Sequence, residues 1–220
     1  APGFGVAVSV QSTKVAVIAI SSNSSLCGGF NSNVIKKTQE VLGGCPDAQV
    51  YSLGRKMSEA MRKAGYASQA DYSDLIAHPS YDKTAGLAES ISKRYLDGEF
   101  SKVILVYNHF VSTSRQEVRV EEYLPFSNEY ESGPDDARGY YIFEPGAGEI
   151  VAELLPKVIR LKLYAAVLDS VAAEHAARTV AMQTATDNAQ ELLSDLTLEY
   201  NKGRQQKITA EILELVGGQQ

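Results

Sequence analysis

Residues 149–216 read EIVAELLPKVIRLKLYAAVLDSVAAEHAARTVAMQTATDNAQELLSDLTLEYNKGRQQKITAEILELV, and this run decides the fold. It holds no proline or glycine except Pro156 and Gly203 and no cluster of turn-forming residues, so it predicts one long helix. Glu149 and Glu153 stand in the first turn, where the positive end of a helix favours carboxylates. Pro156 lies close enough to that end to be tolerated with a kink.

Apolar and small residues follow this predicted helix at alternating spacings of four and three, which is the heptad pattern of a coiled-coil seam. At about 1.5 Å per residue the helix measures roughly 100 Å. Since no other segment of the chain is long enough to cover such a seam, we expect a partner helix from elsewhere, with another copy of the chain as one candidate. The seam residues are Leu154, Val158, Leu161, Ala165, Leu168, Ala172, Met182, Thr186, Ala189, Leu193, Leu196 and Tyr200.

The residues before this helix alternate between strand and helix patterns. A continuous β-branched run, KVAVIAIS at residues 14–21, is typical of a central strand that is covered on both faces. The whole predicts an α/β class with a Rossmann-like, largely parallel sheet, divided into an α/β domain at 1–146 and a very long C-terminal coiled-coil helix at 147–220. The further predicted strands are 49–53, 102–107, an antiparallel edge strand at 117–124 and a short strand at 140–143, and the helices are 31–42, 55–64 and 81–96.

Composition limits the classes of function. The formal net charge of −6 and the pI near 5.2 argue against a nucleic-acid-binding protein, which usually carries a surplus of Lys and Arg. No apolar run approaches the length of a membrane span. Cys27 and Cys45 have neither the spacing nor the histidines of a zinc site, and His78, His109 and His175 lie in no catalytic pattern, so we expect no catalytic residue, no metal and no cofactor.

The loop at residues 21–29 follows a buried strand and precedes a helix, which is where a dinucleotide-binding loop stands. Its glycines, Gly28 and Gly29, are adjacent, and neither G-x-G-x-x-G nor G-K-[ST] occurs, so a tight turn is favoured. An enzyme of the α/β type that binds a nucleotide or metabolite and dimerises through its terminal helix remains the alternative.

Several motifs resemble those of one family. Residues 181–188 (AMQTATDN), 196–205 (LTLEYNKGRQ) and 208–212 (ITAEI) resemble the C-terminal helix of the gamma subunits of F-type ATP synthases. Residues 24–33 (SSLCGGFNSN) are similar to the segment that follows the first strand in that family, and 102–113 and 140–145 show a weaker likeness.

The resemblance implies a non-catalytic central stalk that couples rotation of a membrane rotor ring to ATP synthesis and hydrolysis in partner subunits. Its expected partners are the alpha and beta subunits, an epsilon-type stalk subunit and the c-ring, at the cytoplasmic face of the bacterial inner membrane or its organelle equivalent. The family begins with a long helix that pairs antiparallel with the C-terminal one, and nothing before Lys14 resembles it. This missing helix is a second candidate for covering the seam.

The resemblance also assigns contact residues. Arg204, Gln205 and Thr209 match positions that face a loop of the catalytic subunits, and arginine can bind a carboxylate through two hydrogen bonds. The apolar end of the helix is expected to turn in an apolar sleeve, since strong directional bonds would hold a shaft at one angle. The residues of this tip are Ile208, Ile212, Leu215 and Val216, and those expected at the rotor ring and epsilon-type subunit are Tyr140, Tyr141, Phe143 and Glu144.

Overall fold

The computed structural model describes residues 13–45, 47–66, 70–126, 144 and 146–218. The chain forms two compact units, Ala1–Arg178 and Thr179–Gln220. The first unit holds the sheet and the first part of the long helix. The second holds the remainder of that helix.

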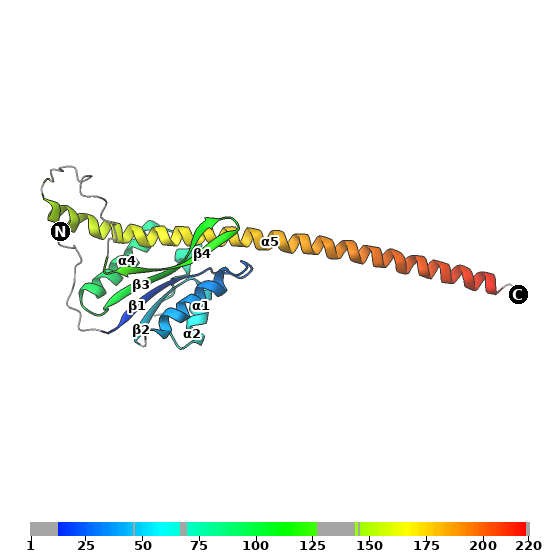
Figure 1. The fold of residues 1–220 in the computed structure, drawn as a ribbon, viewed down its shortest axis with the longest axis horizontal. Helices are drawn as coiled ribbons and strands as arrows, with labels where there is room; N and C mark the ends of the chain where they lie inside the picture. Colours follow the sequence, from blue (N-terminus) through cyan, green and yellow to red (C-terminus); the bar gives the residue numbers. More distant parts are fainter. Residues whose placement is uncertain (1–12, 46, 67–69, 127–143, 145, 219–220) are drawn as a thin grey trace, which may run out of the picture. The chain divides into compact units, whose positions relative to one another are not determined.

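A four-stranded sheet forms the centre of the first unit, in the order β2 (Ala48–Leu53), β1 (Val15–Ile20), β3 (Lys102–Ser112) and β4 (Arg115–Leu124) (Figure 1). β1 runs parallel to both β2 and β3, and β4 runs antiparallel to β3 at the edge. Every residue of β1 is buried, as its unbroken apolar sequence predicts. The predicted α/β class with a largely parallel sheet is confirmed.

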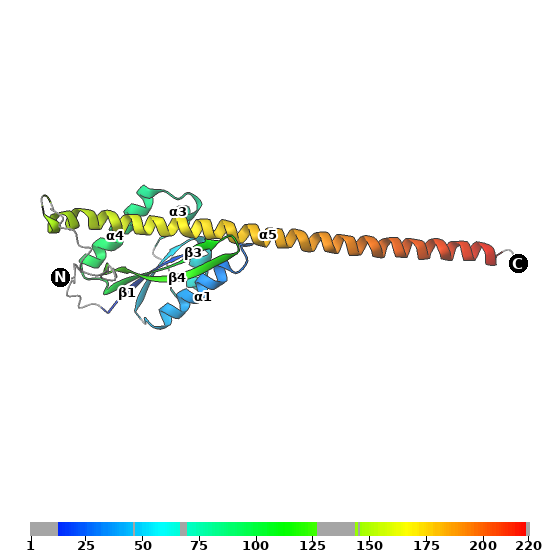
Figure 2. The ribbon, with the colours of Figure 1, turned by 45° about the horizontal axis from the view of Figure 1, so that its top comes forward.

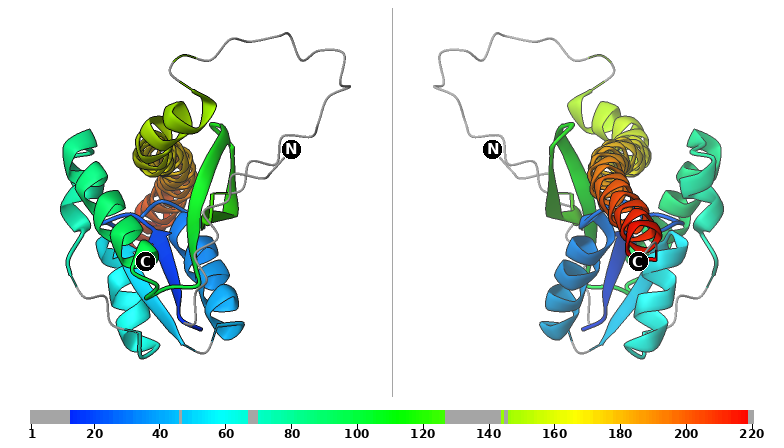
Figure 3. Two further views of the ribbon diagram at one scale, coloured as in Figure 1. Left: turned by 90° about the vertical axis from the view of Figure 1, so that its left-hand side faces the viewer. Right: turned by 90° about the vertical axis from the view of Figure 1, so that its right-hand side faces the viewer.

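Helices cover both faces of this sheet (Figure 3). α1 (Phe30–Gly43) and α2 (Arg55–Lys63) pack on one face, where Val34 and Met57 are fully buried. α3 (Ser73–Ala77) and α4 (Tyr81–Leu96) pack on the other. The predicted helices are confirmed to within one residue at each end. The sequence analysis did not predict α3, because five residues are too few to show helical periodicity.

The long helix is also confirmed, as α5 (Ala147–Gly217), but its first part does not stay uncovered. Ile159, Leu163 and Val167 join the core on the α4 face of the sheet. Figure 2 shows this part of α5 running over the strands of the first unit. The hydroxyl of Tyr123 in β4 donates a hydrogen bond of 2.8 Å to the carbonyl oxygen of Ile159, and burial raises the pKa of that phenol. The sequence analysis did not predict that α5 buries one face in the first unit, whereas the predicted seam stays exposed there, as expected.

The physical reason is that this part of α5 has two apolar stripes. The stripe on the sheet has helical spacing, and the predicted seam runs beside it on the exposed side of the helix. The heptad reading detected the exposed stripe and missed the buried one. Buried on the sheet side are Ile159, Leu163, Ala166, Val167, Ser170, Ala173 and Ala177, whereas Leu154, Val158, Leu161, Ala165, Leu168 and Ala172 are exposed.

Two leucines test this assignment of faces. Leu163 is fully buried and Leu161 is 57% exposed. We predict that Leu163→Ala lowers the free energy of unfolding by about 2 to 5 kcal/mol, because it leaves a cavity in the core. The matched control Leu161→Ala should change it by no more than about 0.5 kcal/mol. Denaturant unfolding followed by circular dichroism measures both, and equal losses would contradict the two-stripe assignment.

Candidate partner-binding surfaces

The crevice where a doubly wound sheet binds its ligand lies at the carboxyl ends of the strands where the strand order reverses, here between β1 and β3. In this chain protein side chains fill that place. Cys27 and Phe30, which follow β1, form a buried cluster with Ala173 and Ala177 of α5. Asn108 of β3 is buried there, with its amide nitrogen 3.4 Å from the carbonyl oxygen of Phe30. The site expected of a nucleotide-binding enzyme is therefore occupied by the loop and by α5.

The side chain of Asn31, at the start of α1, bonds to the loop at residues 21–29. The Asn31 side chain accepts a hydrogen bond from the Ser22 backbone at 3.1 Å, and its Nδ2 donates to Ser22 Oγ at 2.8 Å. The same Nδ2 lies 3.1 Å from Cys27 Sγ. The predicted tight turn is present, since Gly28 has a φ of 57°.

Arg178, the last residue of the first unit, fixes this loop to α5. Its Nη1 donates to Glu174 Oε1 at 2.6 Å, and its Nη2 donates to Ser24 Oγ at 2.6 Å. Glu174 is only 8% exposed, so the guanidinium offsets the cost of burying that carboxylate. We call this group, Ser24, Glu174 and Arg178, the loop clamp.

A second tie joins α5 to the strand β3. Asp169 Oδ2 lies 2.6 Å from His109 Nδ1, and Asp169 Oδ1 accepts a hydrogen bond of 2.9 Å from the backbone of Phe110. Asn108 and Ser112, which are close to His109 in the sequence, have other partners: Asn108 Nδ2 lies 3.4 Å from the carbonyl oxygen of Phe30, and Ser112 Oγ lies 3.5 Å from Ser114 Oγ. No cluster able to hold a metal occurs among the described residues.

The sequence analysis did not single out Arg178 or Asp169, because their partners lie far away in the chain. Leu26, at the tip of the loop, is 72% exposed and has a φ of 67°, which is uncommon for a bulky residue. The only available signal was the similarity of residues 24–33 to one family.

In the second unit every side chain from 182 to 215 is exposed. Arg204, Gln205 and Thr209 all belong to this surface, and Thr209 Oγ1 donates to the carbonyl oxygen of Gln205 at 2.8 Å. The predicted tip residues Ile208, Ile212 and Leu215 are spaced by four and three residues, so they share one face, and all three are exposed. Val216 lies in the same helix.

Of the four residues predicted to contact the rotor ring and the epsilon-type subunit, the structure describes only Glu144. Tyr140, Tyr141 and Phe143, with the predicted strand 140–143, lie outside the described residues, whereas Glu144 is exposed.

Among the described helices, none combines the length and the apolar character that crossing a membrane requires.

Comparisons with known proteins identify the family. The family described as ATP synthase matches residues 5–220. The ATP synthase gamma chain of Phocaeicola vulgatus is 45% identical over 212 residues, covering 93% of this chain and 73% of the relative. The ATP synthase gamma chain of Flavobacterium johnsoniae is 41% identical over 207 residues, which cover 93% of this chain and 72% of the relative.

Solved structures have the same fold. A chain of the Euglena gracilis mitochondrial ATP synthase (OSCP/F1/c-ring) superposes with a TM-score of 0.67 at 22% identity, over 94% of this chain and 72% of that one. A chain of the Tetrahymena thermophila mitochondrial ATP synthase (central stalk and c-ring) superposes with a TM-score of 0.58 at 21% identity, over 79% of this chain and 77% of that one.

A filled ligand crevice and a terminal helix whose last part is bare on every side are features of a subunit that works through its partners. The chain belongs to the ATP synthase gamma chains. It is accordingly a non-catalytic rotor subunit, the central stalk that couples rotation to ATP synthesis and hydrolysis. The comparisons support this reading and not the alternative of a metabolite-binding enzyme.

The loop clamp gives a testable consequence. We predict that Arg178→Ala lowers the free energy of unfolding by about 1 to 3 kcal/mol, because it leaves the buried Glu174 carboxylate without its cation. Arg204→Ala on the same helix, where the side chain is exposed, is the control and should have an effect within about 0.5 kcal/mol. Urea denaturation measures both; an Arg178→Ala variant as stable as the control would refute the clamp.

Proposed function

We propose that residues 147–220 act as the shaft of the stalk and residues 1–146 as its foot, and that alpha and beta subunits enclose the last part of the helix. The observation that carries this proposal is the complete exposure of residues 182–215, a stretch that includes Leu193, Leu196 and Ile212. Apolar side chains gain free energy when another surface removes them from water. A ring of partner subunits supplies such a surface around all sides of one helix.

Coupling requires that the shaft interact differently with its surroundings at different angles. A rotation can bias the conformation of a catalytic subunit only if some contact is stronger in one state than in another. We assign such contacts to Arg204, Gln205 and Thr209, facing a loop of the catalytic subunits. A guanidinium can bind a carboxylate through two hydrogen bonds at one angle and release it to water at the next.

The tip is proposed to work as a bearing. Ile208, Ile212, Leu215 and Val216 would lie in an apolar sleeve, where burial is favourable and has little dependence on direction. A hydrogen-bonded tip would instead favour particular angles. The exposure of Ile208, Ile212 and Leu215 supports this assignment.

The exposed seam in the first unit, from Leu154 to Ala172, is proposed to take a second helix. The occupant we favour is an N-terminal helix of the kind with which the family begins, and another copy of this chain is the competing one. Exposed leucines at helical spacing on a helix already packed on its other side support a helical partner.

At the foot, we propose that Tyr140, Tyr141, Phe143 and Glu144 contact the membrane c-ring and an epsilon-type subunit. The chain is then held peripherally at the membrane through its partners, at the cytoplasmic face of the bacterial inner membrane or its organelle equivalent. The exposure of Glu144 is compatible with such a contact.

Charge reversal tests the contact role of Arg204. We predict that Arg204→Glu lowers coupled ATP turnover of a reconstituted complex by about tenfold, the effect of losing roughly 1.4 kcal/mol of state-dependent interaction. Lys202→Glu makes the same change of charge two residues away and should have a smaller effect. Turnover and proton pumping are measured in vesicles; equal turnover of Arg204→Glu and the parent complex would remove Arg204 from the mechanism.

The bearing assignment is tested at Ile212. Ile212→Ala should preserve most of the turnover, since the bearing needs only an apolar surface. Ile212→Asp should lower turnover and the affinity of the chain for the alpha and beta ring, because a carboxylate would enter the sleeve unpaired. If Ile212→Asp assembles and turns over like Ile212→Ala, the tip does not lie in an apolar sleeve.

A further inference from the structure

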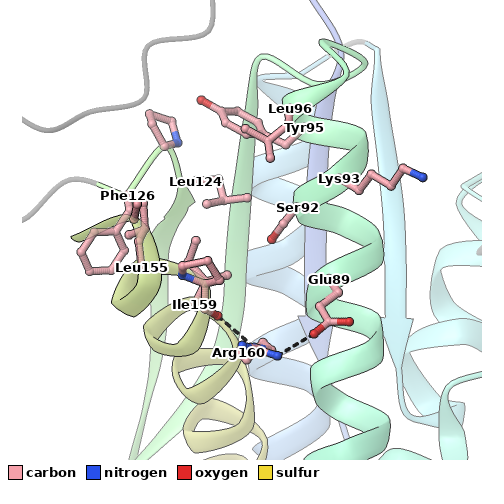
Figure 4. A pocket seen from close by; sticks show the side chains of 13 residues that line it. Glu89, Ser92, Lys93, Tyr95, Leu96, Leu124, Phe126, Leu155, Ile159 and Arg160 are labelled. Carbon is pink, nitrogen blue, oxygen red and sulfur yellow. Dashed lines mark hydrogen bonds and ion pairs between the residues drawn. The ribbon is translucent and has the colours of Figure 1, made fainter. Parts of the chain in front are cut away.

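A cavity of about 410 Å³ lies in the first unit between α4, the end of β4 and the start of α5 (Figure 4). Its volume falls within the range of about 300 to 1,000 Å³ that is usual for small-molecule sites. Its walls are mainly apolar and come from all three elements. The apolar lining includes Tyr95, Leu96, Leu124, Phe126, Leu155 and Ile159.

The walls are held in place by bonds outside the cavity's apolar surface. The hydrogen bond of 2.8 Å from Tyr123 to the carbonyl oxygen of Ile159 joins α5 to β4. Arg160 Nη1 donates to Glu89 Oε1 at 2.7 Å, which joins α5 to α4 along one side of the cavity (Figure 4). Because these ties already exist, the space is formed before any ligand enters.

The charges around the cavity favour a neutral occupant. Arg160 and Glu89 neutralise each other, and Arg160 Nε also donates to the carbonyl oxygen of Pro156 at 3.1 Å. The Tyr95 phenol is uncharged at neutral pH, since the ordinary pKa of tyrosine is about 10 and burial raises it further. Lys93 also lines the cavity, but Figure 4 shows its ammonium on the side of α4 that is turned away from α5. A charged ligand between α4 and α5 would therefore lose its hydration without gaining an unpaired counter-charge.

Besides the charged side chains of Glu89, Lys93 and Arg160, the lining includes the Ser92 hydroxyl and the backbone at Ala152 and Pro156. The Ser92 hydroxyl on α4 is buried and has no hydrogen-bond partner, and Figure 4 shows it on the side of α4 that is turned toward α5. Pro156 has no backbone N–H and so cannot donate to the carbonyl oxygen of Ala152, and both residues line the cavity. A buried polar group without a partner is uncommon in folded proteins and indicates that something else satisfies it.

We propose that this cavity is a binding site for a small uncharged amphiphile of the alkylphenol or alcohol class, with an apolar body and a single hydroxyl. The apolar body replaces water along the walls, and the hydroxyl pairs with Ser92, since a hydroxyl can both donate and accept. The ligand touches α4, β4 and α5 together, so its binding strengthens the attachment of the start of α5 to the sheet domain. This site is separate from the surfaces assigned to protein partners.

Titration of the full 220-residue chain with para-propylphenol, and with propylbenzene as the analogue without a hydroxyl, tests the proposal by calorimetry. Para-propylphenol should bind saturably at one site and about threefold to tenfold more tightly than propylbenzene, the effect of one net hydrogen bond. Ser92→Ala should remove that difference and leave the affinity for propylbenzene unchanged.

Variants that fill the cavity provide the second arm. Ala152→Trp and Leu96→Trp place a ring into the space from exposed positions on opposite walls, and each should abolish binding of both compounds. Ala165→Trp, at an exposed position of the same helix that does not line the cavity, is the matched control and should bind like the parent chain. Circular dichroism verifies that each variant is folded.

Three results would overturn the proposal. The first is the absence of saturable binding to the parent chain. The second is undiminished binding in a folded Ala152→Trp or Leu96→Trp variant, which would place the compounds elsewhere. The third is an equal effect of Ser92→Ala on both compounds, which would remove the hydrogen bond from the account.

Discussion

The structure depends on one constraint: α5 carries more apolar surface than its own domain covers. Up to Arg178 the sheet buries one stripe, with Leu163 and Val167 at its centre, while the parallel stripe from Leu154 to Ala172 stays exposed. From Met182 to Leu215 every residue of the helix is exposed. Since a helix gains most of its stability from packing, this uncovered surface favours packing against a further protein segment.

The same constraint explains why an α/β domain of this type carries no ligand site at the usual place. Doubly wound sheets bind ligands where the strand order reverses, and here α5 lies over that point with Ala173 and Ala177 against Cys27 and Phe30. The loop clamp of Ser24, Glu174 and Arg178 then secures the loop to the helix. α5 thus occupies the place where such sheets bind ligands, in keeping with a non-catalytic central-stalk subunit.

Much of the fold could be predicted from local pattern. The β-branched run of β1, the helix from Tyr81 to Leu96 and the long helix each have a periodicity that their environment produces directly. The attachment of α5 to the sheet could not be predicted. The heptad pattern marks one apolar stripe of the helix, and only the packing of the sheet shows that the neighbouring stripe is the covered one. β3 likewise extends to Ser112, beyond its predicted end at 107, because β4 pairs with it there.

The candidate site was less accessible to sequence reasoning. Contacts such as Asp169 with His109, and Arg178 with Ser24, join residues that are far apart in the chain and have no spacing rule. The assignments at Arg204, Gln205 and Thr209 came from family resemblance, since an exposed helix shows no geometry that marks one residue over another. The role proposed for them depends on a partner, and the chain alone supplies only their exposure.

Amide hydrogen exchange tests the central claim most directly. In the isolated chain at low concentration, the amides of residues 182–215 should exchange far faster than those of β1, because no tertiary contact opposes local opening. In an assembly with alpha and beta subunits, the same amides should become protected while those of β1 change little. Protection of residues 182–215 equal to that of β1 in the isolated monomer would show that the helix is already covered by its own chain, and would contradict the account.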